Sequence, residues 1–327
     1  MKYRLCTRWA GRFVAAALAC GVFACLGAGT AFAASAVQTD ATVSTITCEF
    51  SSMPDNCTVT MGNVEIFDTS QDKTSIIMPA DNIQELTSER AVFTGLPSGS
   101  SSYCFKFNYH YVNNSSGFSG DGTVTLLNPV TVADKASGLK ITGQYSSSKL
   151  LYFSFKNPGN YFGYEVKLTG NDGKTKTLKY DFNGIVSNSS EIVQTSSLKT
   201  AVNQVYKAQV RTYVKVGKNK AVKKYSEWSD TTLLVPQPSL GGKKYSTYAK
   251  ATWNKIKGAK NYTVYASTKA EKGYKKVTTT SKTSCTIKKV AGKKMKANKA
   301  YYYYVVAHAK AGGKTYSSPF IYYSRSY

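Results

Sequence analysis

The sequence has few of the residues that most often carry catalysis or hold a metal. It contains only two histidines, His110 and His308, and neither has a cysteine or an acidic residue at the spacing of a metal-ligand set. The acids Asp68, Asp72 and Asp81 are too dispersed for a calcium-binding loop, and no glycine-rich phosphate-binding loop occurs. These absences predict a protein that is not an enzyme and that uses no cofactor and no metal.

Long hydrophobic runs are equally scarce. The apolar run at residues 13–26 follows four basic residues and precedes a stretch of small residues that ends at Ala31-Phe32-Ala33. This order is typical of a secretory signal peptide, and the run is shorter than the ~20 apolar residues that a membrane-spanning helix needs. We therefore expect a signal peptide at 1–33 and a secreted or cell-surface-associated mature chain of bacterial type, without a transmembrane segment.

Cysteine is also limited. Of the 7 cysteines, only Cys48, Cys57, Cys104 and Cys285 follow the predicted signal peptide. Four cysteines are too few for a disulfide scaffold, so buried cores must supply the stability. Export still permits a single bridge. Because Cys48 and Cys57 flank a short segment that a strand-turn-strand arrangement would close, we predict a Cys48–Cys57 disulfide.

Acidic residues almost disappear toward the C-terminal end. Residues 34–130 contain 3 basic and 10 acidic residues, a net charge of −7, and residues 131–236 have a net charge of +9. Residues 237–327 contain 20 basic residues and one acid, Glu271, a net charge of +19. A gradient this steep predicts an anionic partner for the C-terminal part, and a charge that serves only solubility is the alternative.

The lysines of the C-terminal part are interleaved with tyrosines. We predict that they bind a polyanion through charge alone, so no specific nucleic acid is expected. The expected partners are an anionic cell-wall polymer, an acidic glycan or another surface protein. The lysines assigned to this role are Lys275, Lys276, Lys288, Lys289, Lys293, Lys294, Lys296 and Lys299.

What the chain does contain is a repeated strand pattern. The segment Thr125-Leu126-Leu127-Asn128-Pro129 recurs as Thr232-Leu233-Leu234-Val235-Pro236, 107 residues later, which is about the length of one β-sandwich domain. Alternating polar and apolar residues, rich in Tyr, Thr and Val, predict strands throughout. The sequence therefore predicts an all-β chain of three tandem β-sandwiches, a divergent one at 36–128 and two more at 129–235 and 236–327.

The third unit resembles a fibronectin type III domain. Trp253 stands where that family has a Trp on its second strand, Tyr262-Thr-Val-Tyr265 follows as a strand, and Met295 lies six residues before Tyr301. The resemblance, weaker toward the N-terminal end, implies fibronectin type III or immunoglobulin-like sandwiches. It also implies a tyrosine corner at Tyr301, in which a core Tyr bonds back to the backbone a few residues upstream.

The other two units have their own counterparts of the corner residue. These are Tyr206, eight residues after Leu198, and Tyr103, seven residues after Leu96. The second unit also contains Trp228, in a segment that resembles half of the two-Trp signature of cytokine-receptor modules. One Trp implies no receptor function, and we expect the ring to seal the edge of the sandwich, stacked by Arg211.

The family resemblance implies a spacer, adhesion or binding role. We predict a non-enzymatic binding or adhesion protein whose basic C-terminal module docks on an anionic surface while the acidic first module faces outward. Two alternatives stay open. One is an accessory carbohydrate-binding protein for a separate enzyme, and the other is an enzyme with an unrecognised site in the first domain.

Overall fold

The computed structural model describes residues 34–68, 76–100, 103–145, 150–156, 159–186, 190–194, 202–321 and 323–326. Within these residues the chain is almost entirely β-strand, and its two 3₁₀ helices, η1 (Ala80–Asn82) and η2 (Lys218–Lys220), have three residues each. The predicted all-β class is confirmed. The predicted signal peptide lies outside the described residues.

The first sandwich is formed by strands β1 to β8. One sheet has the order β1-β2-β6-β5 and the other has the order β4-β3-β7-β8. Phe93, Phe105 and Phe107 are fully buried between the two sheets. The strands are β1 (Ser35–Ala41), β2 (Ile46–Ser51), β3 (Cys57–Asp68), β4 (Ile76–Ile77), β5 (Ile83–Leu86), β6 (Arg90–Phe93), β7 (Tyr103–Asn113) and β8 (Ser119–Leu127).

The second sandwich is formed by strands β9 to β16. Its sheets have the orders β13-β10-β9 and β12-β11-β14-β15, and β16 also pairs with β14. Leu151, Phe153 and Val210 are fully buried between them. The strands are β9 (Ser137–Tyr145), β10 (Leu150–Lys156), β11 (Tyr161–Gly170), β12 (Thr175–Val186), β13 (Ser190–Gln194), β14 (Tyr206–Val216), β15 (Val222–Tyr225) and β16 (Thr232–Leu234).

The third sandwich repeats this arrangement with strands β17 to β26. Its sheets have the orders β17-β18-β21 and β20-β19-β24-β25, β26 pairs with β24, and β22 and β23 form a separate hairpin. Ala251, Val264 and Val305 are fully buried between the sheets. The strands are β17 (Leu240–Lys244), β18 (Ala249–Trp253), β19 (Asn261–Ser267), β20 (Lys275–Thr280), β21 (Ser284–Ile287), β22 (Lys289–Val290), β23 (Lys293–Lys294), β24 (Tyr301–Ala311), β25 (Lys314–Ser317) and β26 (Ser324–Ser326).

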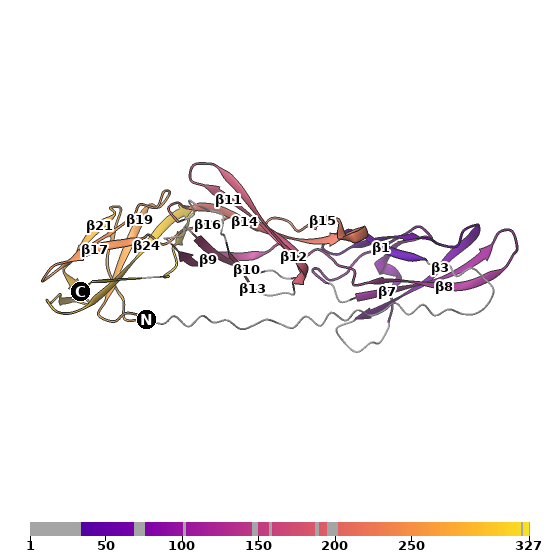
Figure 1. Cartoon of the computed structure of the whole chain (residues 1–327), viewed down its shortest axis with the longest axis horizontal. Coiled ribbons are helices and arrows are strands. Elements are labelled where there is room, and N and C mark those ends of the chain that lie inside the picture. The colour runs from indigo at the N-terminus through magenta and orange to yellow at the C-terminus, as the bar shows by residue number, and fades with distance from the viewer. Residues whose placement is uncertain are drawn as a thin grey trace.

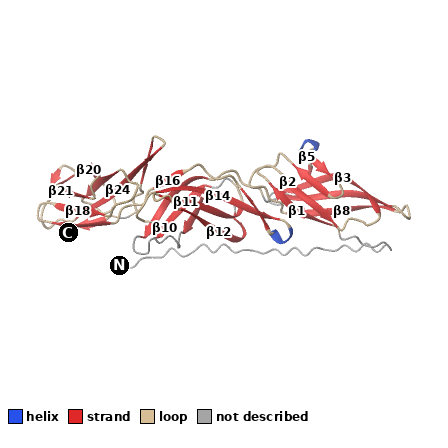
Figure 2. Ribbon diagram, turned by 90° about the horizontal axis from the view of Figure 1, so that it is seen from above, coloured by secondary structure: helices blue, strands red, loops and turns tan. Residues whose placement is uncertain are grey.

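The chain is thus a tandem of immunoglobulin-like β-sandwiches, each made of two antiparallel sheets packed face to face. Figure 1 shows them end to end along the longest axis, with the first and third at opposite ends, and Figure 2 shows the same order from above. The division of the chain at 36–128, 129–235 and 236–327 stays a prediction at the level of its boundaries.

A glutamine side chain ties the first sandwich to the segment that enters the second. The side-chain amide of Gln38 donates to the carbonyl of Val130 at 2.6 Å and accepts from the N–H of the same residue at 2.9 Å. The backbone N–H of Gly217 donates to the Gln38 carbonyl at 2.6 Å. Gly99 approaches Gly159 so closely that a Cβ on Gly99 would overlap its backbone, so this contact requires glycine.

The second junction uses the same device. The side-chain amide of Gln144 donates to the carbonyl of Gln237 at 2.8 Å and accepts from its N–H at 3.0 Å. The Gln237 side chain in turn accepts from the N–H of Ile321 at 2.8 Å. Both glutamines are buried, at 5% and 0% exposure. Because sandwiches joined by free linkers are expected to move relative to one another, these clamps restrict that motion.

We expect Gln144→Ala to loosen the second junction without unfolding the sandwiches. The substitution leaves the buried N–H and carbonyl of Gln237 without that partner, at a cost of roughly 1–3 kcal/mol per group. Small-angle X-ray scattering should show a more flexible particle, while circular dichroism stays unchanged. Gln84→Ala, at an exposed position on β5, is the matched control. Identical scattering from both variants would contradict the clamp.

Candidate functional site

The predicted corner residue Tyr301 begins β24 and is buried in the third sandwich. Its hydroxyl accepts a hydrogen bond from the backbone N–H of Lys296, five residues upstream, at 2.9 Å. Met295 is buried in the same core. Trp253, on β18, also lies in this core, and its indole Nε1 has no hydrogen-bond partner among the described residues.

Tyr206 and Tyr103 begin the corresponding strands of the other sandwiches, β14 and β7. Tyr206 is buried, and its hydroxyl accepts from the side-chain amide of Gln204 at 3.1 Å. Tyr103 is half-buried, and its ring stacks on that of Phe105 with 6.5 Å between the centroids. Leu198 lies outside the described residues, and the corner role of these two tyrosines stays a prediction.

Trp228 lies between β15 and β16, and two cations contact its ring. The Arg211 guanidinium is 4.4 Å from the centre of the Trp228 ring, and the Lys167 ammonium is 4.3 Å from it. Arg211 also donates two hydrogen bonds to Oε2 of Glu165, at 2.7 and 2.9 Å. Only 4% of the Glu165 side chain is exposed, so Arg211 neutralises a buried carboxylate beside the indole.

The predicted Cys48–Cys57 disulfide is wrong, because both thiols are free. The segment between the two cysteines crosses from one sheet to the other, since β2 and β3 belong to different sheets of the first sandwich. Cys48 faces the core and its thiol donates to the carbonyl of Ala91, with 3.8 Å between sulfur and oxygen. The Cys57 sulfur instead accepts from the side-chain amide of Asn113.

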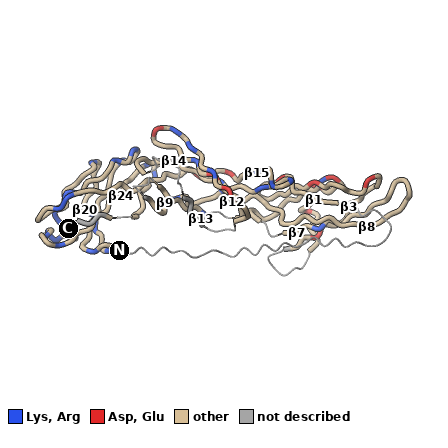
Figure 3. Tube along the Cα trace, viewed as in Figure 1, with Lys and Arg blue, Asp and Glu red and all other residues tan. Residues whose placement is uncertain are grey.

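The basic residues gather at the C-terminal end of the molecule. Figure 3 shows lysine and arginine concentrated on the third sandwich, around β20 and β24, whereas acidic residues lie mainly on the other two. Among the described residues, no carboxylate forms an ion pair with any of the eight predicted polyanion-binding lysines. Their charge is therefore available to an external anion.

Four of these lysines line one depression, here called the lysine groove. On one side of it is β20, the edge strand of one sheet. On the other side are β21, the edge strand of the other sheet, and β22, the first strand of the hairpin that follows β21. Its volume is about 720 Å³, and all four lysines are exposed. The lining residues are Lys275, Lys276, Val277, Thr286, Lys288, Lys289, Ala291 and Gly292.

A like-charge pair stands at the rim of the lysine groove. In the β22–β23 hairpin, Lys289 is directly opposite Lys294, and Val290 is opposite Lys293. Like charges that face each other across a strand pair are destabilising. An anion placed between Lys289 and Lys294 would reduce this repulsion.

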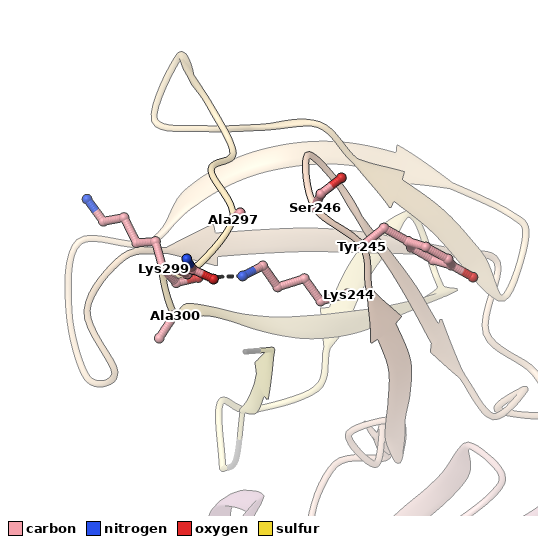
Figure 4. Close-up of a pocket in the computed structure, with 7 residues that line it drawn as sticks. Lys244, Tyr245, Ser246, Ala297, Lys299 and Ala300 are labelled. Atoms are coloured by element: carbon pink, nitrogen blue, oxygen red, sulfur yellow. Dashed lines mark hydrogen bonds between the residues drawn. The ribbon is translucent and has the colours of Figure 1, made fainter.

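Two of the predicted lysines, Lys296 and Lys299, lie apart from the lysine groove and the adjoining hairpin. Lys296 is exposed, and Lys299 lines a second depression of about 640 Å³ together with Lys244, Tyr245 and Asn298. Figure 4 shows the Lys244 ammonium donating to the Lys299 carbonyl, at 2.9 Å, while the Lys299 side chain extends away from it. The Lys244 ammonium is therefore engaged with the backbone, and this second depression is lined by two lysines, compared with four in the lysine groove.

The prediction from sequence missed an aromatic cluster on the outer face of the β20-β19-β24-β25 sheet. Its signal is the run of four tyrosines at 301–304, because alternation along a strand must turn two of them outward. Tyr301 and Tyr303 are buried, whereas Tyr302 and Tyr304 are on the outer face. The cluster, here called the aromatic patch, consists of Tyr265, Tyr274, Tyr302, Tyr304, Phe320 and Tyr323.

No group of three or more His, Cys, Asp or Glu side chains among the described residues is placed to hold a metal ion. His110 pairs with Asp121 at 2.8 Å on the surface of the first sandwich, and His308 bonds to Thr263 and Ser317 on the third. No helix in the described part of the chain has the length and apolar character to cross a membrane.

Comparison with known proteins returns structural neighbours only. No protein-family model matches the chain, and no curated protein matches it. The FN1-FN3 domains of chicken CNTN1 are 12% identical, with a TM-score of 0.27 over 86% of this chain and 96% of that one. Domains from titin are 14% identical, with a TM-score of 0.20 over 88% of this chain and 93% of that one.

A tetra-tandem repeat from the extending region of a large adhesion protein is 10% identical, with a TM-score of 0.27 over 89% of this chain and 73% of that one. TM-scores of this size do not establish a shared fold. The fold assignment therefore rests on the strand pairing and the buried cores.

We expect the thiols to react in the order of their accessibility. Burial raises the pKa of the Cys48 thiol to about 12, so iodoacetamide should leave Cys48 unmodified until the protein unfolds. Cys57, which is half-exposed, should react in the native protein. Peptide mapping without reduction tests whether both thiols are free, and a peptide that links Cys48 to Cys57 would contradict this.

We expect Arg211→Ala to destabilise the second sandwich by about 3 kcal/mol, because it strands the buried Glu165 carboxylate. This value is at the lower end for such pairs, since Lys179 remains 3.7 Å from the other Glu165 oxygen. Urea denaturation measures the change. Lys207→Ala, at an exposed position on the same strand, should change stability by less than about 0.5 kcal/mol. Equal effects would show that the pair contributes nothing.

Proposed function

We propose that this protein is an exported, non-enzymatic binding or adhesion protein made of fibronectin type III-like modules. Its third sandwich docks on an anionic surface polymer through the lysine groove. The first two sandwiches hold the opposite end of the molecule away from that surface. The observation that carries the proposal is a groove lined by four exposed lysines without an ion-pair partner among the described residues.

The charge distribution supports an extended anionic ligand over a single small anion. The lysines of the groove and of the adjoining hairpin come from β20, from the turn after β21, and from β22 and β23, so they belong to several separate strands. A field of one sign raises the local concentration of polyanions and speeds their association. Cell-wall polymers and acidic glycans offer such repeated charge outside the cell.

Strand order, one hydrogen bond and the N-terminal sequence support the parts of this proposal that concern the module type and export. In the second and third sandwiches a three-stranded sheet packs on a five-stranded sheet, whose last two strands both pair with the same neighbour, β14 or β24. This arrangement and the Lys296–Tyr301 hydrogen bond agree with a fibronectin type III-like module. Export rests on the charged, apolar and small-residue order of residues 1–33. Cell fractionation with and without a salt wash would show whether charge holds the protein at the surface.

We expect the combined change of Lys275, Lys276, Lys288 and Lys289 to Gln to weaken polyanion binding by about 100-fold or more at low salt. A lysine close to an anionic surface contributes about 1 kcal/mol, and this attraction is screened as salt rises. Titration calorimetry with polygalacturonate and with polyphosphate, at two salt concentrations, measures the affinity and its dependence on salt.

The control variant changes four exposed lysines outside the groove to Gln and so removes the same net charge. These are Lys250, Lys255, Lys310 and Lys314. The control should weaken binding far less than the groove variant. If both variants lose affinity equally, net charge alone drives binding and the groove has no role. If the wild-type protein binds neither polymer at low salt, the proposed function fails.

A further inference from the structure

The aromatic patch is a continuous layer of rings on the outside of the third sandwich. Tyr265 and Tyr304 lie almost parallel, at 12° and 4.9 Å between ring centroids, and Phe320 is 4.5 Å from Tyr304. Phe320 and Tyr323 remain 48% and 38% exposed. Exposed aromatic clusters of this kind mark binding surfaces, because a soluble protein gains nothing by leaving them in water.

One residue of the lysine groove adjoins the aromatic patch. Lys276 lines the groove and is paired with Tyr265 across β20 and β19, while Tyr265 is paired with Tyr304 across β19 and β24. The three residues therefore stand side by side in one row across three strands. A ligand with a negative charge paired to Lys276 is therefore close enough to contact the rings of Tyr265 and Tyr304 at the same time.

Hydroxyl and imidazole groups lie beside the rings, of which Thr279 and Ser317 are exposed and Thr263 is buried. Thr263 bonds to Thr279 at 3.0 Å and to Nε2 of His308 at 2.8 Å, and Nδ1 of His308 bonds to Ser317 at 2.8 Å. Burial, together with the nearby Lys276 charge, lowers the pKa of His308. The imidazole is therefore neutral at neutral pH, and this band adds polarity without adding charge.

We propose that the aromatic patch and the lysine groove form one site for an acidic polysaccharide. Its sugar rings lie against Tyr265 and Tyr304, and its carboxylates or sulfates pair with Lys276 and the other groove lysines. The inference rests on the proposed function for the anionic part of the ligand. It adds that the polymer is built of sugar rings and is not a polyphosphate.

The chemistry of the surface selects this ligand. A sugar ring presents apolar C–H groups to an aromatic surface and hydroxyls, which donate and accept, around its rim. A polyphosphate has the charge but nothing to place against six rings. The third sandwich of a second copy would bring another net charge of +19 to the same face, so self-association there is opposed by repulsion.

The test compares two stacked tyrosine pairs on the same sandwich. One variant carries Tyr265→Leu and Tyr304→Leu, which keep apolar volume and remove the aromatic rings. The control carries Tyr245→Leu and Tyr248→Leu, a pair stacked at 4.4 Å with Tyr245 in the second depression. Titration of the full chain uses polygalacturonate, polyphosphate, uncharged dextran and single-stranded oligothymidylate, and circular dichroism checks folding.

The patch variant should bind polygalacturonate about tenfold more weakly than wild type, because it loses the aromatic contacts of Tyr265 and Tyr304. It should bind polyphosphate as tightly as wild type does. The control should bind both as wild type does, and dextran should bind weakly if at all. Equal losses for both polymers, or no loss for either, would overturn the inference while the lysine groove keeps its function. Oligothymidylate that binds more tightly than polygalacturonate, and loses that affinity in the patch variant, would make the site one for nucleic acid.

Discussion

The arrangement of the whole molecule depends on two buried glutamine side chains. Gln38 and Gln144 each use both ends of one amide to hold the N–H and the carbonyl of a single residue, 92 and 93 positions later. Each amide thereby provides hydrogen-bond partners for two backbone groups at the junction. Without this constraint, three independently folded sandwiches would sample many relative orientations, and their opposite charges would not be held apart.

The junctions also keep the acidic first sandwich and the basic third sandwich apart. A basic end and an acidic end on a flexible chain could fold back and neutralise each other. In the clamped molecule the first and third sandwiches lie at opposite ends of the long axis (Figure 1), so the lysines of the third remain open to an external anion. The apolar cores supply the stability that offsets like-charge contacts such as Lys289 opposite Lys294.

Contacts could be predicted from the sequence where they depend on a single strand or turn. The spacing of Met295 and Tyr301 depends on a single turn, and the hydrogen bond from Lys296 to the Tyr301 hydroxyl has the expected form. The stacking of Arg211 on Trp228 is likewise anticipated from residue type. The Cys48–Cys57 disulfide failed because sequence proximity says nothing about which sheet each strand joins, and β2 and β3 join different ones.

The all-β class and the basic character of the C-terminal part were determined by the sequence itself, because alternation and composition are local properties. The sequence also predicted a group of polyanion-binding lysines. Only the tertiary structure decided that Lys275, Lys276, Lys288 and Lys289 line one groove, because β20 and β21 belong to different sheets and meet only when the sandwich closes. The same holds for the row from Lys276 to Tyr304, since strand register, which is set by packing and not by composition, places those side chains together.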